Sequence, residues 1–288
     1  MTPHRVRGSV LVAAALAALA ALASPVAAQS PEHPLLILSM GAGYVTGGDI
    51  WRLDRQYTYA GASSGELDSL TLSRIFRPGF TVGVGATLFR SPRFASTLEI
   101  SFLGLTTESR CASLGPVASP YAFDSQHINQ QACEDIQGKS IPTNAAAFQL
   151  GGTWRIVTQG LVQPYVRLVA GAAILGGSFI EASGRVFLQG AIDSLDSQTR
   201  ARVFLADQNR RETTLLATLA AGVTLEAAAG YQLRFEARDI VTRIPTVTGP
   251  GNHTQLEPFA QVGSRTVHLL ALTVALDLAL ERQRTRRY

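Results

Sequence analysis

The stretch that decides the fold is Val267–Leu280, which reads VHLLALTVALDLAL. Leucine or valine stands at every second position from 270 to 280. The alternate positions hold small or polar residues: Ala271, Thr273, Ala275, Asp277 and Ala279. A period of two is that of a β-strand. A strand with one bulky apolar face and one small, polar face fits lipid or a dry core on one side and a crowded polar space on the other.

The same alternation occurs in three further pairs of segments, each pair joined by a short turn. These turns contain Pro92, Gly160 and Gly230. Two further strands are expected, a less regular one at residues 35–45 and one at residues 266–280, which contains Val267–Leu280. The sequence therefore predicts eight strands, at about residues 35–45, 80–90, 94–104, 144–157, 162–175, 213–226, 231–243 and 266–280.

Long polar connections lie between these units, at residues 46–79, 105–143, 176–212 and 244–265. Short turns on one rim and long loops on the other are typical of outer-membrane barrels. We therefore predict an all-β fold, an eight-stranded antiparallel up-and-down transmembrane barrel with three short periplasmic turns and four long extracellular loops. Inside the loops we expect a strand extension over Thr71–Phe76 and a short helix over Ser197–Arg210.

The first 28 residues have the features of a secretory signal peptide. Arg5 and Arg7 precede an apolar run from Val10 to Ala23, and small residues stand before Gln29. This run is shorter than the roughly 18 apolar residues that a membrane-spanning helix needs. We expect residues 1–28 to be removed on export, which leaves residues 29–288 as one barrel domain in the bacterial outer membrane.

The charge of the chain gives no sign of a nucleic-acid partner. Without residues 1–28 the chain has 23 basic and 21 acidic residues, a net charge of +2. Only 16% of all residues are charged, which is little for the surface of a soluble exported domain. The composition favours a barrel in a membrane.

The two cysteines, Cys111 and Cys133, flank one polar stretch of the second long loop. An exported protein meets oxidising conditions, so we expect a disulfide within that loop. A closed loop of this size stabilises a fold by about 3 kcal/mol in the chain-entropy account. We expect no metal and no cofactor, because Cys-x-x-Cys, His-Glu-x-x-His and Gly-x-Ser-x-Gly are absent from the sequence.

The eight alternating strands, with QPYVRL at 163–168 and LRFEAR at 233–238, resemble the small outer-membrane β-barrel family of the OmpA transmembrane domain, OmpX and OmpW. The resemblance implies an integral outer-membrane protein, not an enzyme, with a structural, adhesive or solute-passage role. Its expected partners are outer-membrane lipid, lipopolysaccharide and the barrel assembly machinery, and we expect a monomer with an unknown extracellular ligand. The chain departs from the family after Leu280, where the basic tail 281–288 follows instead of a closing aromatic residue.

Two other architectures or roles remain open. A soluble periplasmic lipocalin-like binder would bury the apolar parity inside and show the polar parity to water. A lateral conduit for small hydrophobic solutes, as in OmpW-like barrels, would leave no residue signature. The membrane barrel is favoured over the lipocalin because the polar parity is mostly Gly, Ala and Thr, which suits a crowded lumen.

The inward parity carries charges of both signs in equal number. They are Glu99, Arg155, Arg167, Glu226, Arg234, Glu236, Arg238 and Asp277. A barrel of eight strands has room only for its own side chains, and charges removed from water must be paired. We therefore predict a structural charge network that plugs the lumen.

Two polar residues lie on the outward parity, Asp239 on the seventh strand and His268 on the eighth. If that hairpin pairs Arg243 with Thr266, the two side chains come close enough to interact. Ser264 and Thr266 continue the His268 face, and an acid, a histidine and a hydroxyl form an activated nucleophile in hydrolases. Outer-membrane lipid A deacylases place such groups on a barrel exterior. We weigh this lipid hydrolase against a polar pair at the membrane interface, and favour the pair.

Overall fold

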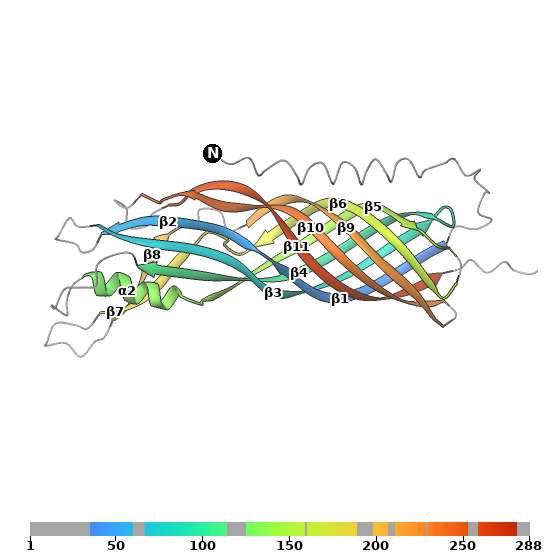
Figure 1. The fold of residues 1–288 in the computed structure, drawn as a ribbon, viewed down its shortest axis with the longest axis horizontal. Coiled ribbons are helices and arrows are strands. Elements are labelled where there is room, and N and C mark those ends of the chain that lie inside the picture. The colour runs from blue at the N-terminus through green and yellow to red at the C-terminus, as the bar shows by residue number, and fades with distance from the viewer. Residues whose placement is uncertain are drawn as a thin grey trace, which may run out of the picture. The chain divides into compact units, whose positions relative to one another are not determined.

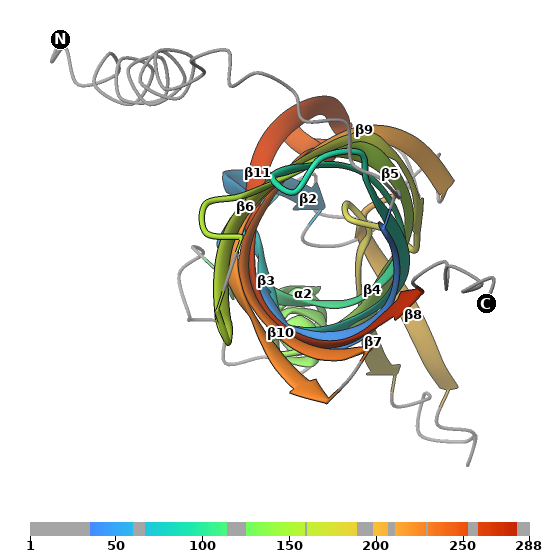
Figure 2. The same cartoon turned by 90° about the vertical axis from the view of Figure 1, so that its right-hand side faces the viewer.

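The computed structural model describes residues 35–59, 67–113, 125–158, 160–188, 198–206, 211–228, 230–252 and 259–280, which belong to one compact unit. The predicted signal peptide and the basic tail 281–288 lie outside the described residues. Eight antiparallel strands form a closed ring, because β1 pairs with both β3 and β11. They are β1 (Leu35–Gly47), β3 (Leu67–Phe89), β4 (Phe94–Ser113), β5 (Ser140–Arg155), β6 (Val162–Gly176), β9 (Arg211–Ala228), β10 (Tyr231–Gly249) and β11 (Gln261–Leu280). Figures 1 and 2 show the barrel from the side and along its axis.

The predicted barrel class is confirmed, and the alternation of apolar and polar residues explains it. In β11 Leu270 and Leu272 are 58% and 66% exposed on the outer face, whereas Leu269 and Ala271 are buried inside. The outer face of every barrel strand shows large apolar side chains. A lipocalin-like protein would bury these side chains, so the soluble alternative is wrong.

The two ends of the barrel differ in the length of their connections. The turn end carries the three short turns after β3, β5 and β9, and the loop end carries the four long connections (Figure 1). Gly230, in the turn between β9 and β10, has a φ of 79°, which suits a residue without a side chain. The chain therefore folds as three tight hairpins, and β1 and β11 pair with each other to close the ring.

Several strands continue well past their predicted ends at the loop end. β3 has 23 residues and β4 has 20, and they stay paired from Phe89↔Ala95 to Leu70↔Ser113. The predicted extension over Thr71–Phe76 is part of β3. The barrel wall therefore extends beyond the length that an outer-membrane strand needs.

In their described residues, the long connections contain four elements of their own. They are β2 (Asp49–Tyr59), α2 (Ser125–Ile136), β7 (Ala182–Leu188) and β8 (Gln198–Leu205), and all lie at the loop end in Figure 1. The short helix expected over Ser197–Arg210 is wrong, since β8 is a strand that pairs with β7. Val203, Phe204 and Leu205 favour extended backbone, and β7 supplies the hydrogen-bonding partner that the sequence pattern did not reveal.

The interior of the barrel has two layers of different chemistry. Buried apolar side chains fill the half near the loop end, among them Val45, Leu103, Leu175, Ile240 and Leu269. The half near the turn end contains charged and hydroxyl-bearing side chains, with a small apolar group of Ile37, Phe89 and Ala95 below them. The inward-facing residues are thus small or polar near the turn end, as the sequence shows, and form an apolar core toward the loop end.

Candidate functional site

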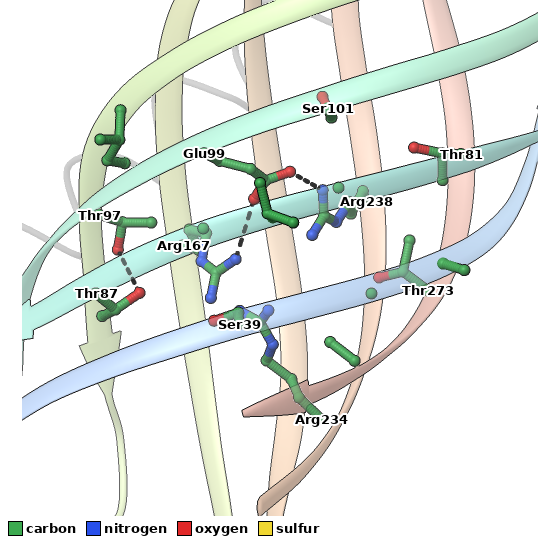
Figure 3. Close-up of a pocket in the computed structure, with 17 residues that line it drawn as sticks. Ser39, Thr81, Thr87, Thr97, Glu99, Ser101, Arg167, Arg234, Arg238 and Thr273 are labelled. Carbon is green, nitrogen blue, oxygen red and sulfur yellow. Dashed lines mark hydrogen bonds and ion pairs between the residues drawn. The ribbon is translucent and has the colours of Figure 1, made fainter. Parts of the chain in front are cut away.

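Six of the eight predicted lumen charges lie in one connected network near the turn end. Figure 3 shows four of them, Glu99, Arg167, Arg234 and Arg238. Arg167 Nη1 lies 3.3 Å from Glu99 Oε2 and 3.4 Å from Glu236 Oε2. Arg238 pairs with both of these carboxylates. Arg234 lies 3.9 Å from Glu236 and 3.4 Å from Asp277. Three guanidinium groups thus face three carboxylates, so the network is neutral.

The network is supported by buried hydroxyl and amide groups. The Tyr165 hydroxyl donates to Glu236, and Arg167 Nε donates to Thr153 Oγ1 at 3.2 Å. Gln149 Nε2 donates to Thr218 Oγ1 at 2.8 Å across the lumen. Paired and hydrogen-bonded charges are less costly to bury than isolated charges.

Arg155 and Glu226 are not joined to this network by an ion pair in the described part of the chain. The guanidinium carbon of Arg155 lies 3.8 Å from the centre of the Phe89 ring, in a cation–π contact. Glu226 is exposed at the turn end, two residues before β9 ends. Both stand on the predicted inward parity, but the barrel wall ends beside them and leaves Glu226 in solvent.

Two small spaces lie beside the network among the described residues. A cavity of about 20 Å³ lies inside the barrel next to Glu99 and Ser101 and is lined by residues of β1, β3, β4, β6, β10 and β11. Figure 3 labels its polar lining residues. A second, also about 20 Å³, lies beside Arg155 and Tyr165. Each has room for about one water molecule, so neither forms a continuous channel.

A buried segment at the loop end was not revealed by the sequence patterns. We call residues 178–181, between β6 and β7, the cap segment. Phe179 and Ile180 are 2% and 1% exposed and pack in the apolar core. Gly177, with a φ of 95°, turns the chain into this segment.

Two buried side chains hold the cap segment by its backbone. Arg74 is fully buried and donates to the Ser178 carbonyl oxygen at 2.9 Å and to the Glu181 carbonyl oxygen. Trp51 Nε1 donates to the Phe179 carbonyl oxygen at 2.6 Å, and the Arg74 guanidinium carbon lies 5.7 Å from the Trp51 ring centre. The available sequence signal for this cap was the apolar pair Phe179-Ile180, which follows Gly176, Gly177 and Ser178 in a long polar connection.

Asp239 and His268 meet on the outer face, as the sequence predicts. The expected pairing of Arg243 with Thr266 is present, which places His268 opposite Val241 and diagonal to Asp239. His268 Nδ1 lies 3.0 Å from Asp239 Oδ2, and the two side chains are 62% and 36% exposed. The pair stands directly beyond the apolar positions of β10 and β11, at the loop end.

Ser264 is not brought to this pair. It lies four positions from His268 on the same strand, opposite Pro245, and a strand rises about 3.3 Å per residue. Its hydroxyl is therefore too far away to be activated by His268, and the described residues give His268 no other hydroxyl partner. The geometry fits a polar pair better than a hydrolase centre.

The predicted disulfide joins Cys111 on β4 to Cys133 on α2, with the two Cα atoms 5.3 Å apart. The same helix is fixed to β7 by Asp135, which accepts a hydrogen bond from the Arg185 backbone N–H at 2.8 Å. This bond, with the nearby charges of Lys139 and Arg185, lowers the pKa of Asp135 below its usual value despite some burial. The described residues contain no group of three side chains suited to a metal ion, and no helix among them is long and apolar enough to cross a membrane.

Comparison with known proteins gives structural likeness only. No protein-family model matches the sequence, and no curated protein matches it. Among solved structures, the chain is similar to Neisserial surface protein A, with 11% identity, 86% of this chain and 99% of that chain covered, and a TM-score of 0.39. It is also similar to the outer membrane protein OprG from Pseudomonas aeruginosa (9% identity, 88% and 99% covered, TM-score 0.43) and to the outer membrane protein AlkL (9% identity, 90% and 95% covered, TM-score 0.38). At these identities and scores the likeness carries no argument about function, and the architecture rests on the strand pairings of this chain.

Proposed function

We propose that the protein is an integral outer-membrane barrel with a closed lumen, exported with a cleaved signal peptide. Its role is structural or is an interaction made by its loop-end surface. The turn end faces the periplasm and the loop end faces the exterior. The chain acts as a monomer, with membrane lipid and lipopolysaccharide around it and the barrel assembly machinery as its folding partner. We propose no enzymatic activity.

The observation that carries the proposal is an apolar outer belt around an interior of buried side chains. On β11 the belt runs from Leu270 to Leu280 without a polar outward residue. Ten residues at a rise of about 3.4 Å, tilted by about 40°, cover about 25 Å of height, which is that of the apolar band of outer-membrane barrels. An exposed apolar surface of this extent has no stable place in water.

Aromatic side chains mark both edges of this belt. Phe80 and Phe102, with ring centres 6.0 Å apart, lie toward the loop end. Phe94 and Trp154 stack with their centres 6.2 Å apart at the turn end. Aromatic girdles at the two membrane interfaces are typical of such barrels, which supports the proposed depth.

The closed ring of hydrogen bonds favours a sealed barrel over a lateral conduit. Each of the eight barrel strands pairs with two neighbours. Where β3 bulges at Pro78 and Gly79, a side chain on Gly79 would come within 2.2 Å of the Gly104 carbonyl oxygen. The wall is thus tightly packed at the one interruption of the β3–β4 pairing.

Expression in a Gram-negative host tests the proposed location. The protein should sediment with the outer membrane, resist extraction by alkaline carbonate and migrate faster on a gel before boiling than after it. The N-terminus of the mature chain, read by mass spectrometry, should be Gln29. Recovery of a folded protein in the soluble periplasmic fraction would contradict the proposal.

A further inference from the structure

We propose that Arg77 and Arg110, held by Glu108 on the outer face of β3 and β4, bind a phosphate group of a glycolipid in the outer leaflet. We call these three residues the arginine clamp. The inference rests on the proposed membrane location, and it names a lipid partner and the residues that recognise it.

The β-bulge in β3 places Arg77 on the outer face. Arg77 pairs with Thr106 and Phe80 pairs with Gly104, so β3 has one residue more than β4 between these two pairs. The extra residue reverses the facing of β3 beyond the bulge. Phe80 and Arg77 therefore both point outward although they have opposite parity, and Glu108 and Arg110 follow on the same face of β4.

The charges of the arginine clamp are arranged to leave positive charge available. The Glu108 side chain is only 7% exposed, whereas Arg77 and Arg110 are 51% and 52% exposed. One Glu108 oxygen pairs with Arg77, and the other lies 3.4 Å from Arg110 Nε. One carboxylate thus orients two guanidinium groups, and the cluster keeps a net charge of +1 with N–H donors facing outward.

A guanidinium group matches a phosphate with two parallel hydrogen bonds. Because Glu108 fixes both arginines before a ligand arrives, binding costs little side-chain entropy. A carboxylate ligand would also pair with arginine, but the position of the arginine clamp selects a lipid phosphate.

That position is directly beyond the loop-end edge of the apolar belt. The Phe80 ring lies over Gly104, where a side chain would come within 2.4 Å of Phe80 Cε1, one residue pair below Arg77 and Thr106. A lipid whose phosphate binds the arginine clamp can thus place its acyl chains along Phe80 and Phe102. A soluble phosphate gains nothing from this apolar surface.

The test measures lipid binding to the full barrel, refolded in detergent and followed by native mass spectrometry. Bisphosphorylated lipid A is compared with the same lipid after enzymatic removal of its phosphates, and inorganic phosphate is the soluble competitor. We expect the Arg77→Gln, Arg110→Gln double variant to bind the bisphosphorylated lipid about tenfold more weakly than wild type or worse. Arg52→Gln is the matched control, because Arg52 is 72% exposed and pairs one-to-one with Asp54 on β2; it should bind as wild type does.

Glu108→Gln separates a preorganised clamp from general attraction. This change raises the positive charge but frees both arginines, so the arginine clamp should bind the lipid more weakly, whereas general attraction would make the binding tighter. Tighter binding by Glu108→Gln, equal binding of both lipid forms, or competition by millimolar inorganic phosphate would each overturn the inference. Heat-dependent gel migration and insertion into vesicles are measured for every variant. Failure of wild type to insert would refute the proposed function, whereas normal insertion with unchanged lipid binding by the double variant would refute only the arginine clamp.

Discussion

At the scale of single residues, the lumen network depends on buried charges that have no water to replace a lost partner. Glu236 is 3% exposed and faces Arg167, Arg234 and Arg238. The sequence alone predicts that these eight groups share one inward parity, and six of the eight meet in the structure. Alternation does not show where the barrel wall ends, so the prediction includes Glu226, which is exposed.

Glu236→Gln should therefore destabilise the barrel strongly. Removing one member of a buried ion pair leaves uncompensated charge and costs about 3 kcal/mol or more. The measurement is the free energy of unfolding in urea for protein refolded into lipid vesicles. Glu226→Gln is the control at an exposed inward-parity position and should change that free energy by less than about 0.5 kcal/mol. Equal effects of the two substitutions would show that the network contributes no stability.

The Asp239–His268 pair leads to a prediction about chemistry rather than stability. Because Ser264 lies too far from His268 to be activated, the pair should not hydrolyse lipid. Lipid A from a host that expresses wild type should have the same acyl-chain profile by mass spectrometry as lipid A from a host that expresses His268→Ala or carries the empty vector. Loss of an acyl chain with wild type alone would restore the deacylase hypothesis.

At the scale of elements, alternation predicted every barrel strand, because each buries one face and shows the other. It failed where another contact overrode the pattern. Strict alternation along β3 would place Arg74 on the outer face together with Phe80. The bulge at Pro78 and Gly79 reverses the alternation, so Arg74 faces inward. β8 has residues that also suit a helix, and its pairing with β7 decides between the two.

The cap segment should loosen when Arg74 loses its charge. Arg74→Met removes three buried hydrogen bonds, those from Arg74 to the carbonyl oxygens of Ser178 and Glu181 and to the Ser109 hydroxyl. Loss of a donor to a buried acceptor costs about 1–3 kcal/mol, so local opening should become easier by about 3 kcal/mol. Hydrogen exchange at the Ile180 and Glu181 amides, which both donate to Ser178 Oγ, should be about a hundredfold faster. Arg52→Met is the control, and the barrel amides of β5 should exchange as before in both variants.

If exchange at Ile180 and Glu181 does not change in Arg74→Met, the apolar contacts of Phe179 and Ile180 hold the cap segment without the buried arginine. If the amides of β5 also exchange faster, the cap segment and the barrel open together, and the cap is not a separate cooperative unit.

At the scale of the whole molecule, two chemically different layers fill one barrel. The charged layer is visible in the sequence as balanced inward charges. The apolar layer depends on side chains from β2, α2, β7 and the cap segment, which belong to the same buried cluster as those of the barrel strands. No local pattern encodes that long-range packing. It also means that the loop-end elements are part of the core, since Ala132 and Ile136 of α2 are buried in it.

The most direct test of a closed lumen is single-channel recording on the refolded protein in a planar lipid bilayer, with a general porin as the positive control. Wild type should insert and show no stable conductance. A variant with Phe179→Ala and Ile180→Ala should also stay closed, because the charged layer near the turn end still fills the lumen. A steady, ion-conducting pore formed by wild type would contradict the account.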